Sequence, residues 1–115
     1  MQGLIVMIRA MPKAILIHSV EYKEYIGKGR YGKDYKEPIT LENVLIQPVS
    51  SISRTNAMDS ISYNSLMFYD CVNSLPKDIK FTKDSIITFN GEEMIINRVN
   101  PIYTFNLHHY ELELI

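Results

Sequence analysis

The chain has 115 residues, a length that fits one domain built around one hydrophobic core. Its 46% of hydrophobic and 22% of charged residues exclude an intrinsically disordered polymer. A formal net charge of −1 gives no electrostatic sign of a nucleic-acid or membrane partner. The single cysteine, Cys71, excludes an internal disulfide and fits synthesis in a reducing cytosol.

The N-terminal residues do not match a targeting signal. The apolar run from Leu4 to Ile8 is far shorter than the about 20 residues that a membrane-spanning helix needs. No basic residue precedes this run, and Pro12 follows where a signal peptidase requires small residues. We therefore expect no membrane association. We expect one β-barrel-like domain over residues 1–115, with residues 1–11 as a flexible or extended leader.

Two-residue alternation, the pattern of a β-strand, begins at residues 14–25. On one side of this strand lie Leu16, His18, Val20 and Tyr22, and we expect burial on both faces at its start and on one face at its end. Residues 26–38 are rich in glycine, lysine and tyrosine and predict a flexible loop that ends at Pro38. Further strands are predicted over residues 39–47 and 61–72, with a polar connection at residues 50–60 between them.

The second half of the chain contains the clearest local prediction. Asn90-Gly91 separates two β-rich runs, residues 85–89 and 92–99, and favours a hairpin with a type I′ turn. Asn100-Pro101 is expected to end the second of these strands. Residues 108–115 alternate cleanly and predict a final strand.

These elements predict an all-β, mainly antiparallel fold with little helix. Five to six short strands separated by turns and long loops are typical of a small barrel or sandwich. No segment carries a helical stripe longer than a turn or two.

The segment Gly27-Lys-Gly-Arg-Tyr-Gly32 matches the G-x-G-x-x-G pattern of dinucleotide-binding sites. In those sites the glycines open a helix whose N-terminus holds a pyrophosphate. Here Pro38 and another predicted strand follow in place of a helix, so the pattern indicates a glycine-rich β-loop and no cofactor.

The same loop interleaves tyrosines with lysines and an arginine, which is a feature of single-strand nucleic-acid platforms. Glu21, Glu24, Asp34 and Glu37 nearly cancel its positive charge, whereas a groove that follows phosphates needs an excess of cations. A protein interface is therefore the favoured interpretation, since tyrosine and arginine are common anchors of interfaces. A small nucleic-acid-binding β-barrel module is the alternative, and direct nucleic-acid contact is not expected.

No residue pattern points to catalysis or to a metal ion. His108 and His109 are adjacent on a predicted strand, where neighbouring side chains point to opposite faces. His18 lies among apolar residues, which is typical of a half-buried histidine with a hydrogen-bond partner. Cys71 has no activating neighbours in sequence. The sequence predicts a protein that is not an enzyme and binds no metal.

Four segments carry a resemblance to a known family. They are residues 18–25 (HSVEYKEY), 38–46 (PITLENVLI), 87–99 (ITFNGEEMIINRV) and 109–115 (HYELELI). In this order and spacing they resemble minor capsid proteins of phages and prophages of Gram-positive bacteria, from about Pro12 to the C-terminus.

The resemblance implies a structural component of a tailed-phage virion, made in the bacterial host cytoplasm. By analogy of fold, such a subunit belongs at the head–tail junction and contacts portal, adaptor or neighbouring subunits as a homo-oligomer. Its loops would make these contacts. The residues that we expect to contact partners are Tyr25, Arg30, Tyr31, Tyr35, Arg54 and Asn56.

Overall fold

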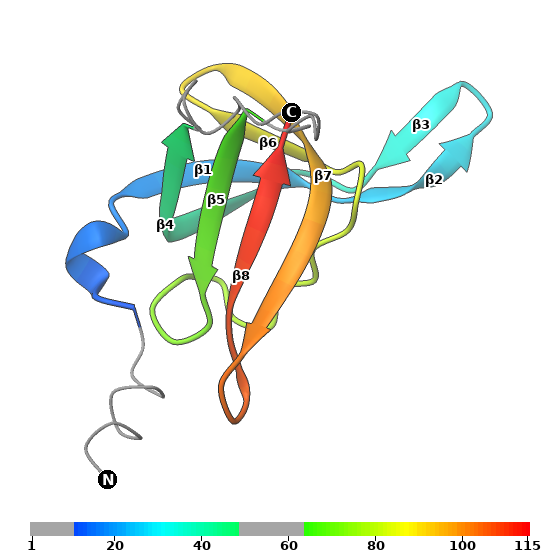
Figure 1. Ribbon diagram of the computed structural model, residues 1–115. Helices are drawn as coiled ribbons and strands as arrows, with labels where there is room; N and C mark the ends of the chain where they lie inside the picture. Colours follow the sequence, from blue (N-terminus) through cyan, green and yellow to red (C-terminus); the bar gives the residue numbers. More distant parts are fainter. Residues whose placement is uncertain (1–10, 49–63) are drawn as a thin grey trace, which may run out of the picture.

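The strands close into an antiparallel barrel, which confirms the predicted fold class (Figure 1). The computed structural model describes residues 11–48 and 64–115. The barrel strands, in their order around the barrel, are β1 (His18–Lys23), β4 (Ile39–Pro48), β5 (Ser65–Asp70), β8 (Leu107–Leu114), β7 (Glu92–Tyr103) and β6 (Ile86–Phe89). Pairing of Tyr22 with Ile87 joins β1 to β6 and closes the barrel. Each barrel strand therefore has a paired neighbour on both sides for at least part of its length.

The alternating apolar side chains fill the barrel, as the two-residue period predicted. Fully buried aliphatic residues come from every barrel strand, and each contributes about 1.5–3 kcal/mol by leaving water. Two tyrosines, Tyr22 and Tyr69, pack against Phe81 with ring centroids 5.3 and 5.2 Å away. The core residues are Val20, Tyr22, Leu41, Val44, Ile46, Met67, Tyr69, Phe81, Ile87, Met94, Ile96, Leu112 and Leu114.

The hairpin at Asn90-Gly91 is confirmed. Its two turn residues have φ angles of 51° and 80°, and β6 and β7 pair on either side of them. A type I′ turn needs positive φ at both positions, which asparagine and glycine tolerate best.

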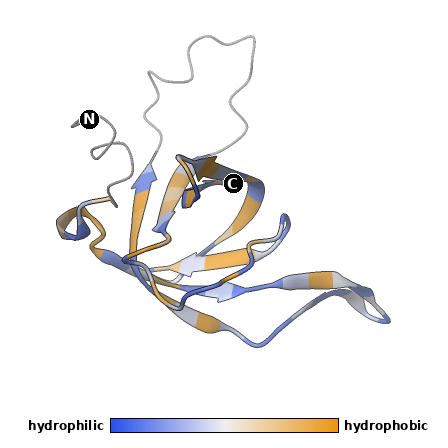
Figure 2. Cartoon of the chain, turned by 90° about the horizontal axis from the view of Figure 1, so that it is seen from below, coloured by the Kyte–Doolittle hydropathy of each residue, from blue (hydrophilic) through white to orange (hydrophobic). Residues whose placement is uncertain are grey.

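The predicted loop at residues 26–38 is wrong in part, because most of it forms a second β-hairpin. Strands β2 (Tyr25–Gly29) and β3 (Gly32–Tyr35) pair as a separate two-stranded sheet that extends away from the barrel (Figures 1 and 2). Gly27 and Gly32 each have a φ of 117°, a conformation that glycine adopts readily. The glycines that suggested a flexible loop therefore allow the backbone of this hairpin. We call residues 25–35 the arm.

The first strand starts later than predicted. Residues Lys13–Ile15 form a short 3-10 helix, η1, and β1 begins only at His18. Pro12, with φ of −59°, precedes this turn and suits the start of a helix. The predicted polar connection at residues 50–60 and the start of the predicted strand at 61–63 lie outside the described residues, as do residues 1–10 of the predicted leader.

The prediction that Asn100-Pro101 ends its strand is also wrong. Strand β7 continues to Tyr103, and Pro101 pairs with Tyr110 of β8. β6 pairs only with the first residues of β7, up to Ile95, so β7 has one neighbour at Pro101. A proline is tolerated where one side of a strand makes no backbone hydrogen bonds to a neighbouring strand.

A buried carboxylate organises the loop that leaves β5. Asp70 is fully buried, and its Oδ2 accepts hydrogen bonds from the N–H groups of Val72 and Asn73 at 3.1 and 2.8 Å. Its Oδ1 accepts a third from the N–H of Met11 at 3.2 Å. The Ser74 hydroxyl accepts a hydrogen bond from the Asp70 N–H at 2.8 Å. These contacts fix the loop at this end of the barrel.

Candidate interaction surface

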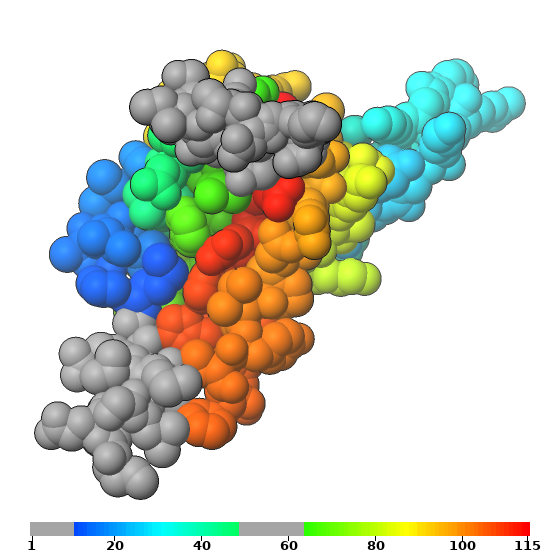
Figure 3. Space-filling model, viewed as in Figure 1, coloured from blue at the N-terminus to red at the C-terminus, as the bar shows by residue number. Residues whose placement is uncertain are grey.

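The arm projects from the barrel as a two-stranded ribbon and carries the most exposed aromatic side chain of the described residues (Figures 1 and 3). Its turn consists of Arg30 and Tyr31, and Tyr31 is 93% exposed. The Arg30 guanidinium lies 5.9 Å from the centre of the Tyr31 ring. The end of the arm is therefore a cation beside an exposed aromatic ring, a combination typical of interface anchors.

The two tyrosines nearest the barrel stabilise the arm internally. Tyr25 and Tyr35 are paired across β2 and β3, with ring centroids 5.7 Å apart. Lys23 lies 5.8 Å from the Tyr35 ring and Lys33 lies 5.9 Å from the Tyr25 ring. Such cation–π contacts contribute about 0.5–1 kcal/mol each at exposed sites. These rings are already engaged with neighbours of their own chain.

Hydrogen bonds fix the base of the arm to the barrel. The N–H of Tyr25 donates to the Oγ of buried Ser85 at 2.9 Å. The Tyr22 hydroxyl donates to the carbonyl of Lys80 at 2.8 Å and accepts from the N–H of Thr82 at 3.1 Å. Burial raises the pKa of Tyr22, so this hydroxyl keeps its proton at neutral pH. The arm therefore starts from a rigid support.

The structure brings four of the six predicted contact residues together on the arm. Tyr25 and Tyr35 lie at its base, and Arg30 and Tyr31 at its tip. Arg54 and Asn56 lie outside the described residues. A contact role for any of the six stays a prediction.

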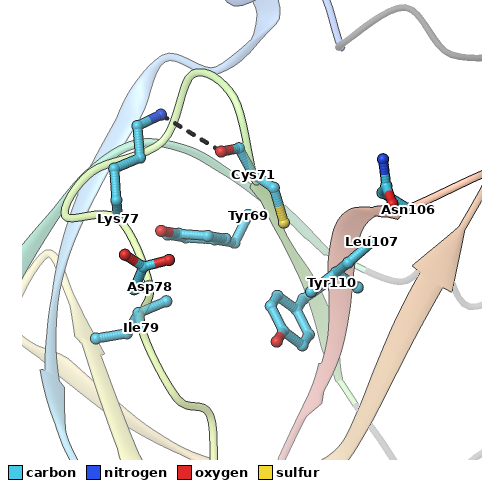
Figure 4. A pocket seen from close by; sticks show the side chains of 8 residues that line it. All are labelled: Tyr69, Cys71, Lys77, Asp78, Ile79, Asn106, Leu107 and Tyr110. Carbon is cyan, nitrogen blue, oxygen red and sulfur yellow. Dashed lines mark hydrogen bonds between the residues drawn. The ribbon is translucent and has the colours of Figure 1, made fainter.

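Sequence analysis did not predict a pocket at the end of the barrel where β5 ends and β8 begins. It has a volume of about 470 Å³ and is walled by the loop after β5, by the β7–β8 turn and by Tyr69 and Tyr110 (Figure 4). We call it the rim pocket. Its lining residues are Tyr69, Cys71, Lys77, Asp78, Ile79, Asn106, Leu107 and Tyr110.

The rim pocket has an aromatic floor and a polar wall. Tyr69 and Tyr110 stand 6.1 Å apart by ring centroids, and both pack on Phe81. Burial, followed by nearby negative charges that include Asp78, raises the pKa of Tyr69 to about 12. Burial also raises the pKa of Tyr110. Both side chains therefore present neutral hydroxyls at physiological pH.

The two charged residues of the rim pocket do not pair with each other. The Lys77 ammonium donates to the carbonyls of Val72 and, at 3.4 Å, of Cys71, and it points away from Asp78 (Figure 4). Among residues 11–48 and 64–115, Asp78 makes no ion pair. The carboxylate thus remains available to a cation from outside.

Exposed apolar side chains surround this end of the barrel. Val72, Tyr103 and Phe105 are 62%, 65% and 66% exposed. A second hollow, lined in part by Val72 and Phe105, adjoins the rim pocket and shares three lining residues with it, Cys71, Asn106 and Leu107. Apolar residues gathered at one end of a molecule are a feature of interaction sites.

The adjacent histidines do not diverge as predicted. The Nδ1 atoms of His108 and His109 lie 2.8 Å apart, and the Nε2 of His109 lies 3.1 Å from an Oε of Glu111. The cause is a β-bulge, because Ile102 pairs with His109 and Tyr103 with Leu107, which leaves His108 as an extra residue. A bulge redirects side chains that a regular strand would separate.

Two further predictions concern single residues. His18 is half-buried and its Nδ1 accepts a hydrogen bond from the N–H of Ile46 at 3.0 Å, which confirms the predicted role. Burial and the nearby Asp70 charge raise the pKa of Cys71, so its thiol is mainly protonated at neutral pH.

Within the described part of the chain, no cluster of three or more histidine, cysteine, aspartate or glutamate side chains is arranged to hold a metal ion. The same residues include no helix with the length and apolar character needed to span a membrane.

Comparison with known proteins identifies the family. No curated protein matches the chain. A family model described as "Minor capsid protein" matches residues 12–114, which is nearly the whole sequence and includes both the arm and the rim pocket. The match agrees with the resemblance of the four segments identified in the sequence. The chain therefore belongs to the minor capsid protein family.

Proposed function

We propose that the protein is a structural subunit at the head or head–tail junction of a tailed-phage particle, where it acts through protein–protein contacts and not as an enzyme. It is made in the cytoplasm of a bacterial host and joins the virion as a homo-oligomer beside portal or adaptor subunits. Membership of the minor capsid protein family supports a place in the virion.

The single observation that carries this proposal is the arm. The barrel strands are paired on both sides over at least part of their length, whereas each strand of the arm pairs only with the other and has an open outer edge. An isolated two-stranded hairpin is only marginally stable in water, so a projecting one gains most when it docks. Tyr31, exposed at its tip, supplies an anchor that needs a partner surface.

A role as a nucleic-acid-binding module has less support. Base stacking along a strand needs several free ring faces, and two of the three arm tyrosines, Tyr25 and Tyr35, contact each other and two lysines. A titration of single-stranded DNA at two salt concentrations tests this alternative. Salt-sensitive micromolar binding would favour it.

Complementation of a phage that lacks its own copy of the gene tests the proposal. Arg30→Ala combined with Tyr31→Ala should lower the titre and the amount of the protein in purified particles. The matched control is Glu92→Ala with Glu93→Ala, which alters two exposed residues on the β6–β7 hairpin. Normal titre and normal incorporation of the arm variant would refute a role for the arm.

A further inference from the structure

The arm tip and the rim pocket have complementary chemistry. The tip presents an exposed aromatic ring with a guanidinium beside it. The rim pocket presents two tyrosine rings and Ile79 with the Asp78 carboxylate beside them (Figure 4). Its volume of about 470 Å³ lies in the range of cavities that accept ligand groups.

The charges of the two surfaces are also opposite. Lys77 is engaged by backbone carbonyls, which leaves Asp78 as the charged group of the rim pocket that can accept a cation. Between Tyr25 and Tyr35 the arm has Lys28, Arg30 and Lys33 against Asp34 alone, so it carries a positive excess. An arginine and a carboxylate form the strongest side-chain hydrogen bonds at interfaces.

The two surfaces belong to different molecules when they meet. No arm residue lines the rim pocket, and the arm points away from the β7–β8 turn in Figure 1. The arm base is fixed by Ser85 and Tyr22, so the tip does not swing across the end of its own barrel.

We propose that the arm tip of one copy docks into the rim pocket of a second copy. Tyr31 packs against Ile79 and Tyr110, above the buried Tyr69, and Arg30 pairs with Asp78. The contact joins two different surfaces, so repetition of it links copies head to tail into a ring or a chain. This inference rests on the proposed function, and it names the partner and the site.

Cross-linking in assembled particles tests the contact, because Cys71 already lines the rim pocket. A phage that carries Lys28→Cys, an exposed arm position beside the turn that leaves Arg30 and Tyr31 in place, is purified, treated with a short bismaleimide and resolved on a denaturing gel. We expect covalent multimers of this protein, with peptides around residue 28 joined to peptides around Cys71. Adding Cys71→Ser should abolish them.

Three outcomes would overturn the proposal. Dimers that persist with Cys71→Ser would show tip-to-tip contact. A cross-link from residue 28 to another virion protein would assign the tip to a different partner. Particles that contain the variant but yield no cross-linked product would place the tip away from Cys71. In each case the protein remains in the particle, so the proposed structural function survives. Absence of the wild-type protein from particles would refute that function instead.

A double-mutant cycle tests the Arg30–Asp78 pair in the Lys28→Cys background. Arg30→Gln and Asp78→Asn should each lower the initial cross-linking rate about fivefold. Asparagine suits position 78, where φ is 56°. If the two residues pair, the double variant loses no more than either single variant. Losses that multiply would contradict the pairing.

Discussion

The N–H of Tyr25 donates a hydrogen bond to the Oγ of Ser85 over 2.9 Å, and this contact joins the first residue of the arm to the barrel. Ser85 is fully buried, and its Oγ also lies 3.4 Å from the Tyr22 hydroxyl. Its carbonyl accepts a hydrogen bond from the N–H of Ile96 in β7 at 2.9 Å. One serine therefore connects the arm, β1 and β7.

We predict that Ser85→Ala destabilises the protein by about 1–3 kcal/mol, because it leaves the Tyr25 N–H without its partner in a partly buried position. Urea unfolding measures the free energy, and hydrogen exchange should show faster exchange of the Tyr25 amide. Ser19→Ala, at an exposed position of β1, is the control and should stay within about 0.5 kcal/mol of wild type. Equal stability of the two variants would contradict this role.

Asp70→Asn should cost about 2 kcal/mol of unfolding free energy. The buried carboxylate accepts hydrogen bonds from the N–H groups of Met11, Val72 and Asn73, and an amide replaces one of its acceptor oxygens by a donor. Thermal and urea unfolding measure the loss. Asp84→Asn provides a matched control, because Asp84 has a φ of 74° and asparagine tolerates that conformation. The prediction fails if the two variants unfold alike.

The sequence predicts the strands of the barrel because most of them alternate apolar with polar residues. Leu112 and Leu114 of β8, for example, lie two residues apart and are both fully buried. Asn90-Gly91 specified its turn through local conformational preference alone. The strand at Pro101 was missed because its tolerance of proline depends on where the neighbouring strand β6 ends, which is a property of the assembled sheet.

Only the arm, and not the rim pocket, could be predicted as a contact site from the sequence. Interleaved tyrosines and cations indicated a contact surface in this part of the chain. The glycines there predicted a flexible loop, whereas the residues form the paired strands β2 and β3. The rim pocket combines residues from β5, from the loop after it and from β8, and nothing in their spacing marks them as neighbours. The contact between His108 and His109 depends on a bulge set by pairing with β7, so a regular strand predicted the opposite arrangement.

Gly91→Ala should destabilise the β6–β7 hairpin by about 1 kcal/mol. A Cβ at this position meets no atom within 4 Å, so the expected cost comes from the φ of 80° alone. Urea unfolding measures the change. Glu92→Ala, at the next and exposed position, controls for the loss of a neighbouring side chain. A Gly91→Ala protein as stable as this control would show that the turn relaxes without strain.

Tyr69→Phe should change how stability depends on pH. An unfolded tyrosine ionises near pH 10, whereas burial raises the pKa of Tyr69 to about 12 in the folded protein. The raised pKa of Tyr69 therefore contributes fully to the free energy of unfolding below pH 10. This contribution is lost as the pH rises from about 10 to about 12, because the unfolded chain releases a proton there that the folded protein retains. Without this hydroxyl, the free energy of unfolding should fall less steeply over that interval.

At neutral pH the Tyr69→Phe variant should be about 1 kcal/mol less stable, because it loses the hydrogen bond to the Pro76 carbonyl. Urea unfolding across the interval measures both effects. Tyr31→Phe, at the exposed tip, should leave the neutral-pH stability within about 0.5 kcal/mol of wild type. Parallel pH profiles for wild type and Tyr69→Phe would mean that Tyr69 ionises as readily in the folded rim pocket as in the unfolded chain.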